Sequence, residues 1–150
     1  MSIKPLYNDE QFMQEALKEA KKAYEAGEVP VGAVIVAGDK IIARCHNLTE
    51  RLHDVTAHAE MQCITSAANA IGGKYLPECS IYISLEPCPM CAGALGWSQI
   101  GKLVFGASDP KKGYRLFSEK LLHPKTKVSH GLLAAESEEL LKAFFRDRRK

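Results

Sequence analysis

Two short clusters in this chain of 150 residues carry the side chains best suited to chemistry, His58 with Glu60 and Cys88 with Cys91. One imidazole and two thiolates can hold zinc and leave the fourth tetrahedral position open, as in catalytic sites, whereas structural sites are closed by a fourth protein ligand. Zinc lowers the pKa of its bound water from near 16 to about 7, and Glu60 stays free to carry protons. The two clusters therefore predict zinc-assisted hydrolysis.

The spacing inside each cluster predicts that both lie where a helix begins. Residues three apart share one face of a helix, so the two cysteines can point the same way, and Pro87 suits a position just ahead of a helix or in its first turn. A helix N-terminus also favours a thiolate. His58 and Glu60 would diverge by about 200° on a regular helix. We therefore expect them in the first turn, with the metal near the helix end and Thr56 as the N-cap.

A Cys-x-x-Cys segment taken alone has other interpretations. In an intracellular protein it is often a redox-active dithiol, and a structural zinc site would need a fourth ligand. Cys45, Cys63 and Cys79 stand apart from the pair and from one another, and we expect them to be small buried hydrophobic residues. The combination of His-x-Glu with a later Pro-Cys-x-x-Cys is more specific than either half, and it is a known signature of zinc-dependent nucleobase deaminases.

The composition is that of one soluble globular domain, which we expect to span residues 1–150. Hydrophobic residues make up 46% of the chain and charged residues 25%, which is enough for a single core. The sequence has no run of roughly 18 to 20 apolar residues that could cross a membrane, and its first ten residues lack the apolar core of a secretion signal. Five cysteines, an odd number, favour a reducing compartment. We therefore expect a cytoplasmic protein without membrane association.

The net charge of +2 is spread unevenly along the chain. Residues 1–101 carry 8 basic and 12 acidic side chains, whereas residues 102–150 carry 12 basic and 6 acidic ones. The basic side chains of the second part include Lys111, Lys112, Arg115, Lys125, Lys127, Arg146, Arg148, Arg149 and Lys150. Such a region can bind phosphates, although a solvated helix face with a basic tail that complements the helix dipole would give the same composition.

Hydrophobic periodicity predicts alternating helices and strands. Helices are expected over residues 9–26, 57–70, 88–97 and 136–148, with Asn8 or Asp9 capping the first. Strands are expected over residues 32–37, 40–45, 80–85, 102–106 and 127–130, with a helical turn around 116–122 and the last strand at an edge. This order predicts an α/β fold, a three-layer α/β/α sandwich around a central mixed sheet of about five strands, with both clusters at helix starts beyond strand ends.

Several stretches resemble those of a known family. They are residues 28–36 (EVPVGAVIV), 57–61 (AHAEM), 85–94 (LEPCPMCAGA) and 100–107 (IGKLVFGA), then Asp109, Lys111 and Gly113, and the ending 141–149 with Phe144 and Phe145. Together they resemble the cytidine deaminase-like superfamily and, more narrowly, the bacterial tRNA-specific adenosine deaminases. The zinc motifs identify only the superfamily, whereas the first and last stretches point to the tRNA enzymes.

The resemblance implies a reaction and a cofactor. His58, Cys88 and Cys91 would bind one Zn²⁺ per subunit, and Glu60 would be the catalytic proton shuttle. The reaction would be hydrolytic conversion of adenosine to inosine at the wobble position of a tRNA anticodon loop, with attack at C6 and release of ammonia. A loop base is already unpaired, which avoids the cost of opening a duplex.

The resemblance also implies how the substrate is held. Asn47 would hydrogen-bond the base, and the pocket would be lined by Val31, Ala59 and Leu85. Asp109 and Phe145, together with the basic tail, would lie near the bound anticodon loop. Members of this family are homodimers, so a homodimer is expected here, with charge from both subunits joined into one RNA-binding surface.

Some positions depart from the family pattern, and other functions remain open. Pro89 stands where valine is frequent, Gln99 where arginine is common, and residues 114–117 (YRLF) replace a run of small residues. The Asn-His pair that is common before the last strand is missing. An alternative is a zinc-dependent deaminase of a free nucleobase or nucleoside such as guanine or cytosine, and the basic second part of the chain argues against it. A zinc-stabilised RNA-binding module and a dithiol oxidoreductase are further alternatives.

Overall fold

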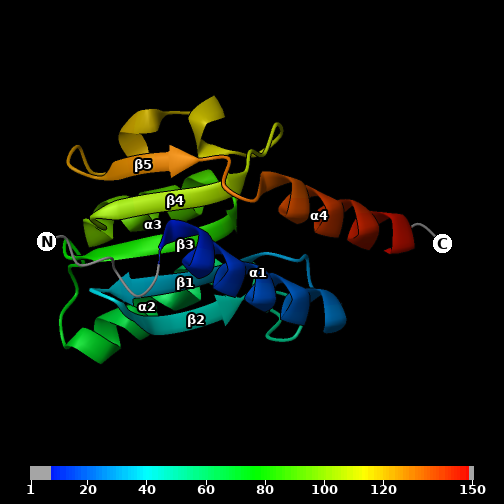
Figure 1. Cartoon of the computed structure of the whole chain (residues 1–150), viewed down its shortest axis with the longest axis horizontal. Coiled ribbons are helices and arrows are strands. Elements are labelled where there is room, and N and C mark those ends of the chain that lie inside the picture. Colours follow the sequence, from blue (N-terminus) through cyan, green and yellow to red (C-terminus); the bar gives the residue numbers. More distant parts are fainter. Residues whose placement is uncertain (1–7, 149–150) are drawn as a thin grey trace, which may run out of the picture.

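A five-stranded mixed sheet forms the centre of the computed structural model, with strands in the order β2-β1-β3-β4-β5 (Figure 1). The strands are β1 (Gly32–Ala37), β2 (Lys40–His46), β3 (Cys79–Leu85), β4 (Lys102–Ala107) and β5 (Lys127–His130). Strand β1 runs antiparallel to β2 and β3, whereas β4 runs parallel to both β3 and β5. The structure describes residues 8–148, so Arg149 and Lys150 of the predicted basic tail lie outside the described residues.

Helices cover both faces of this sheet. They are α1 (Asp9–Glu25), α2 (Ala59–Ile71), α3 (Pro89–Ser98) and α4 (Ala134–Arg148). Helices α1 and α4 pack on one face, and α2 and α3 lie behind the sheet on the other (Figure 1). The predicted three-layer α/β/α sandwich is confirmed.

The sheet divides the core into two parts. Along β1, Val34 and Val36 face the helix α1, whereas Ala33 and Ile35 face the opposite layer, as the alternation of a strand requires. Because both sides are covered, this strand reads as a continuous apolar run in the sequence. A Cβ atom at Gly32 would lie 2.1 Å from the carbonyl oxygen of Ala16 in α1, so the close approach of this helix to the sheet depends on glycine.

Local sequence signals placed most element ends correctly. The predicted edge strand over 127–130 is β5, and the predicted helices and strands begin and end within about two residues of the observed ones. Asn8 caps α1 through a reciprocal capping box with Gln11, which confirms the predicted start. The turn expected around 116–122 consists of two short 3₁₀ helices, Tyr114–Leu116 and Glu119–Leu121.

The predicted N-cap of the second helix is wrong. The helix α2 begins at Ala59, and its N-cap residue is His58 rather than Thr56. Both the backbone N–H and the hydroxyl of Thr56 donate hydrogen bonds to the carboxylate of Asp54, at 2.8 and 2.7 Å. Thr56 therefore belongs to a tight turn closed by Asp54, because this local bond competes successfully with helix capping.

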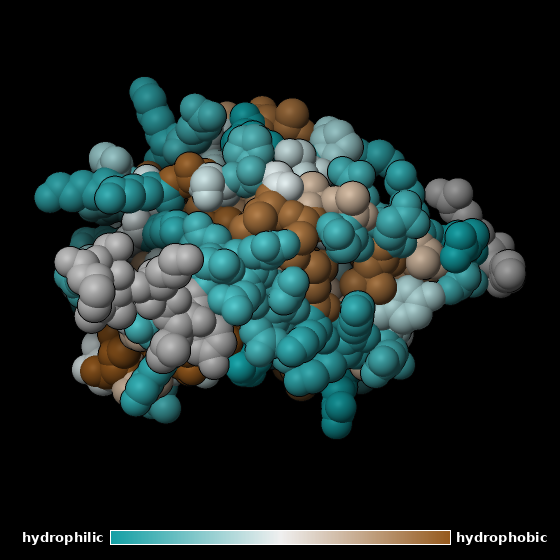
Figure 2. Space-filling view, in the orientation of Figure 1, coloured by the Kyte–Doolittle hydropathy of each residue, from teal (hydrophilic) through white to brown (hydrophobic). Residues whose placement is uncertain are grey.

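The face that carries α1 and α4 is largely hydrophilic, with hydrophobic side chains visible between the helices and the strands (Figure 2). Within residues 8–148, no helix combines the length and the apolar character needed to cross a bilayer.

Candidate active site

His58, Cys88 and Cys91 come together where two helices start. His58 and Cys88 are the N-cap residues of α2 and α3, with extended backbone conformations, and Pro89 occupies the first turn of α3. Neither N-cap side chain forms a capping hydrogen bond, so both are available to point into the site. Because His58 lies outside the helix, the 200° divergence of a regular helix does not apply, and His58 and Glu60 both lie at the start of α2, where they were predicted.

The three side chains have the spacing of a metal site. The Nδ1 atom of His58 lies 3.5 Å from the sulfur of Cys91 and 3.7 Å from that of Cys88, and the three ligand atoms all lie within 4.8 Å of one another. Tetrahedral zinc with ordinary Zn–N and Zn–S bonds places nitrogen and sulfur about 3.6 Å apart, so the arrangement fits zinc. Within the described part of the chain, this group comprises three side chains and no fourth.

Glu60 adds a buried acid beside this group. Its residue is 3% exposed, and its Oε1 atom has no hydrogen-bond partner among residues 8–148. Burial raises the pKa of Glu60, against the opposing effect of His58. A buried carboxylate with an unpartnered oxygen is costly for a fold and typical of a functional site.

The two thiols and the imidazole shift one another's pKa values. The hydrogen bond from Cys91 lowers the pKa of Cys88 to about 4, with His58 adding to the effect and burial opposing it. The same bond, together with burial, raises the pKa of Cys91. The hydrogen bond with Cys88 raises the pKa of His58. A metal held here would bind both sulfurs as thiolates, so its binding would release the proton of Cys91.

The other cysteines do not join this group. Cys63 and Cys79 are buried, as predicted, whereas Cys45 is only partly buried. Cys45 and Cys63 are isolated in the sequence but lie close together in the fold, where contact with Cys63 lowers the pKa of Cys45. Ala33 explains the contact: its carbonyl accepts from the Cys63 thiol at 3.4 Å, and it pairs across the strands with Cys45.

Asn47 connects the predicted base pocket to the metal-binding group. Its Oδ1 atom accepts from the backbone N–H of Ala59 at 3.0 Å, and its Nδ2 atom donates to the carbonyl of Val29 at 3.1 Å. Its own backbone N–H donates to Val31 at 3.2 Å. Asn47, Val31 and Ala59 are all buried, and these hydrogen bonds bring them together next to His58. Leu85, the last residue of β3, is only partly buried and approaches the same region from the strand that leads to Cys88.

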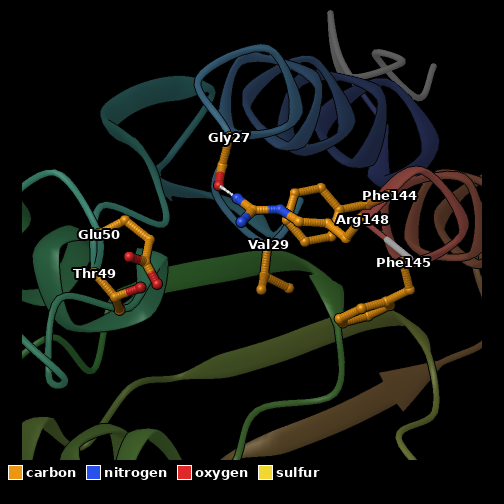
Figure 3. Close-up of a pocket in the computed structure, with 7 residues that line it drawn as sticks. All are labelled: Gly27, Val29, Thr49, Glu50, Phe144, Phe145 and Arg148. Atoms are coloured by element: carbon orange, nitrogen blue, oxygen red, sulfur yellow. Dashed lines mark hydrogen bonds between the residues drawn. The ribbon is translucent and has the colours of Figure 1, made fainter. Parts of the chain in front are cut away.

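Phe145 lines a separate cavity, which is shown in Figure 3. The cavity has a volume of about 230 Å³ and is lined by Gly27, Val29, Thr49, Glu50, Phe144, Phe145 and Arg148. Phe145 is 47% exposed, and Arg148 lies over the ring of Phe144 and donates a hydrogen bond to the carbonyl of Gly27. Val29 links this cavity to Asn47.

Asp109 lies on the other side of the group, in the loop after β4. Its carboxylate accepts from the backbone N–H groups of Lys111 and Lys112, each at 3.0 Å, and so closes a turn. Its own backbone N–H donates to Glu86, two residues before Cys88. Asp109 is thus placed next to the cysteine end of the site, and its side chain is engaged within the turn.

Sequence reasoning missed Glu28, which is completely buried. Its carboxylate accepts from the hydroxyl of Thr49 at 3.3 Å and from the backbone N–H groups of Glu50 and Arg51 at 3.0 and 2.9 Å. Glu28 therefore holds the loop that joins Asn47 to His58. A single acid inside the apolar run 28–36 was the signal that could have found it.

Glu86 and Arg115 were also missed as a pair. Glu86 is 4% exposed and forms an ion pair with Arg115. Burial alone would raise the pKa of Glu86, but the bonds from Arg115 and from two backbone N–H groups lower it. Arg115, which was expected to contribute to a phosphate-binding surface, is turned inward instead. An acid between a buried strand and Pro87 was the available signal.

Known proteins match nearly the whole chain. The family model for the zinc-binding region of cytidine and deoxycytidylate deaminases matches residues 6–107. The tRNA-specific adenosine deaminase of Bacillus subtilis (strain 168) is 49% identical over 147 residues, which cover 95% of this chain and 91% of that protein.

Solved structures of deaminases also match this chain. One from biochemical and structural studies of A-to-I editing by tRNA:A34 deaminases at the wobble position is 45% identical, with a TM-score of 0.81, over 87% of this chain and 98% of the other. Guanine deaminase from Bacillus subtilis is 38% identical, with a TM-score of 0.65, over 68% and 66% of the two chains. This chain therefore belongs to the tRNA-specific adenosine deaminases, within the zinc-binding family of cytidine and deoxycytidylate deaminases.

Proposed function

We propose that this protein hydrolyses adenosine to inosine at the wobble position of a tRNA anticodon loop and releases ammonia. The observation that carries the proposal is the buried carboxylate of Glu60, whose Oε1 atom has no hydrogen-bond partner among residues 8–148, beside three side chains with zinc spacing. The tRNA substrate is supported by relatives that carry this name and align over more than nine tenths of the chain. A cytoplasmic location is proposed together with that substrate.

His58, Cys88 and Cys91 are proposed to hold one zinc ion per subunit. Bound zinc would acidify a water molecule so that hydroxide is available at neutral pH. Glu60 would accept the proton that this water loses, pass it to a ring nitrogen of adenine, and then help protonate the departing amine. A pKa raised by burial suits a carboxyl group that must hold a proton during part of the cycle.

Asn47, Val31, Ala59 and Leu85 are proposed to position the base. An asparagine amide has two N–H donors and two acceptor positions on its oxygen, and the bonds to Val29 and Ala59 use one of each. These bonds fix the amide plane, and the remaining N–H and lone pair are available to the base. The buried Val31 and Ala59 supply apolar contact for the ring.

Phe145 and Asp109 are proposed to lie along the path of the anticodon loop. The ring of Phe145 is 47% exposed, and an exposed aromatic face can stack an unpaired base. Asp109 would lie at the side of the base pocket away from Phe145, where its carboxylate closes the turn that carries Lys111 and Lys112.

A homodimer is proposed through α3 and the segment that follows β4. This part of the surface carries four exposed apolar side chains, which are Met90, Trp97, Leu116 and Phe117. Trp97 is 85% exposed, and large apolar groups gathered on a surface are typical of protein interfaces. We propose that a second copy of this chain covers these side chains, in keeping with the expectation from the family.

One experiment tests the function directly. The zinc-loaded protein is incubated with an anticodon stem-loop that carries adenosine at the wobble position, with the same stem-loop carrying uridine there, and with free guanine, cytosine and adenosine. Inosine and ammonia are expected from the first RNA alone. Ammonia from the free bases only would contradict the tRNA proposal and favour the alternative of a free-base deaminase.

A further inference from the structure

The carboxylate of Glu86 is bonded on both oxygens. Its Oε1 atom accepts from the backbone N–H of Asp109 at 3.0 Å and from Nη2 of Arg115 at 3.2 Å. Its Oε2 atom accepts from the backbone N–H of Arg115 at 3.1 Å and from Nε of the same residue at 3.2 Å. The side chain of Glu86 is 2% exposed, so these charge-assisted bonds form out of contact with water.

These bonds attach the turn after β4 to the strand end that carries Cys88. Glu86 and Pro87 directly precede Cys88, and the carbonyl of Pro87 accepts from the backbone N–H of Tyr114 at 3.0 Å. A Cβ atom at Gly113 would lie 2.3 Å from the carboxyl carbon of Glu86, so any larger residue there would displace this carboxylate.

Arg115 is itself fixed from three further sides. Its guanidinium donates to the hydroxyl of Ser108 at 2.7 Å and to Nε2 of His130 in β5 at 3.1 Å. It also lies over the ring of Phe105 in β4, 5.0 Å from the ring centre. The side chain therefore spans from β5 across β4 to Glu86.

The turn over 109–113 presents two cations. Lys111 and Lys112 are exposed, their backbone N–H groups are bound by the carboxylate of Asp109, and neither ammonium group has an ion-pair partner among residues 8–148. Two such ammonium groups, on a turn that is hydrogen-bonded to Glu86, are suited to neighbouring phosphates of an RNA backbone.

We propose that Arg115 is a positioning residue which, through Glu86, holds the turn over 109–113 so that Lys111 and Lys112 bind phosphates of the anticodon loop. This inference rests on the proposed function for its substrate. Arg115 contacts no reacting atom, and its effect is on RNA affinity.

The first test is direct binding of a fluorescent anticodon stem-loop, measured by anisotropy without turnover. Arg115→Met and Glu86→Gln are each expected to raise the Kd roughly tenfold, because the lysines lose their fixed position. The double variant should bind no more weakly than either single variant, since both remove the same clamp, by which we mean the ion pair between Glu86 and Arg115. In single-turnover kinetics at saturating RNA, the Arg115→Met rate should stay within about threefold of the wild type. The matched control is Lys120→Met, an exposed cation outside the clamp.

The second test follows backbone hydrogen exchange over residues 108–116. Asp109 and Arg115 donate their backbone N–H groups to Glu86, so exchange should accelerate in both clamp variants and not in Lys120→Met.

An unchanged Kd together with unchanged exchange in Arg115→Met, or additive losses of RNA affinity in the double variant, would overturn the inference. If the wild type binds the stem-loop but forms no inosine, the proposed function fails. The Kd values and the hydrogen exchange of the variants still show whether the ion pair between Glu86 and Arg115 supports RNA binding. Absence of RNA binding by the wild type would overturn both.

Discussion

Glu60 shows at the scale of one residue how an unfavourable arrangement can indicate function. A buried carboxylate normally binds several N–H groups, as Glu28 and Glu86 do here. Glu60 is equally buried but has an oxygen without a partner among residues 8–148. The fold therefore holds this acid in a place that benefits the proposed reaction more than stability.

Replacing Glu60 by glutamine tests this directly. The variant is expected to lose ammonia release by about 10²- to 10⁴-fold, because it cannot transfer protons, while zinc content stays unchanged. Thermal stability should stay equal or rise, since a buried charge is removed. Loss of zinc from this variant would instead make Glu60 a ligand, and unchanged ammonia release would refute its catalytic role.

The metal ligands allow a second prediction at this scale. Cys91→Ser should reduce bound zinc to near zero, because the remaining imidazole and thiolate leave the metal with too few ligands. Cys45→Ala, which changes a cysteine outside the group, should retain zinc. Metal content by mass spectrometry gives the answer, and full zinc retention in Cys91→Ser would point to a different ligand set.

Among the elements, the loop between β2 and α2 depends on one buried acid. Glu28 accepts three hydrogen bonds from residues 49–51, and this loop carries Asn47 at one end and His58 at the other. Glu28→Gln keeps the size of the side chain but turns an N–H₂ group toward N–H donors. We expect a loss of about 1–3 kcal/mol in the free energy of unfolding, measured with denaturant. The matched control, Glu25→Gln on the exposed end of α1, should cost almost nothing.

Asp9 ties the first helix to the sheet and predicts a pH dependence. Its carboxylate accepts from the hydroxyl of Tyr82 at 2.6 Å and from Lys102 at 2.8 Å. Burial alone would raise the pKa of Asp9, but the hydrogen bonds from Lys102 and Tyr82 outweigh it and lower the pKa. The folded value thus lies below the unfolded value of about 3.9, so this stabilisation is present above that pH and is lost as the pH falls through the folded pKa.

The measurement compares melting temperatures from about pH 5 to pH 3. The wild type should lose more stability over this interval than Asp9→Asn, which has no carboxylate to protonate. Glu10→Gln, an exposed neighbour in the same helical turn, should follow the wild type. Identical slopes for the wild type and Asp9→Asn would refute the assigned role.

For the whole molecule, the exposed apolar side chains of α3 lie on the sheet face opposite to α1. If a second copy covers them, Trp97→Glu should produce a monomer, because a charge replaces the most exposed large apolar group of that surface. Sedimentation velocity should then give about half the mass of the wild type. Gln14→Glu adds the same single charge on exposed α1 and should leave the mass unchanged. A monomeric wild type would end the dimer proposal.

The sequence alone predicted most features that depend on residues close together in the chain. The metal-binding group and the neighbouring acid could be predicted because His58 and Glu60, and likewise Cys88 and Cys91, occur in short motifs typical of zinc sites. The element ends followed from caps and periodicity, as with Asn8 and the capping box of α1. Where two local interactions competed, as at Thr56, the prediction failed, because nothing in the sequence ranks a turn closed by Asp54 against a helix cap.

Only the tertiary structure decided which distant groups satisfy one another. Glu28 binds a loop more than twenty positions away, and Glu86 binds Arg115 across the turn after β4. Arg115 looked like part of a phosphate-binding surface and lies against Phe105 instead. These pairings form because each buried carboxylate must be matched by hydrogen-bond donors. Those donors become its neighbours only when the sheet and its two helical layers have assembled.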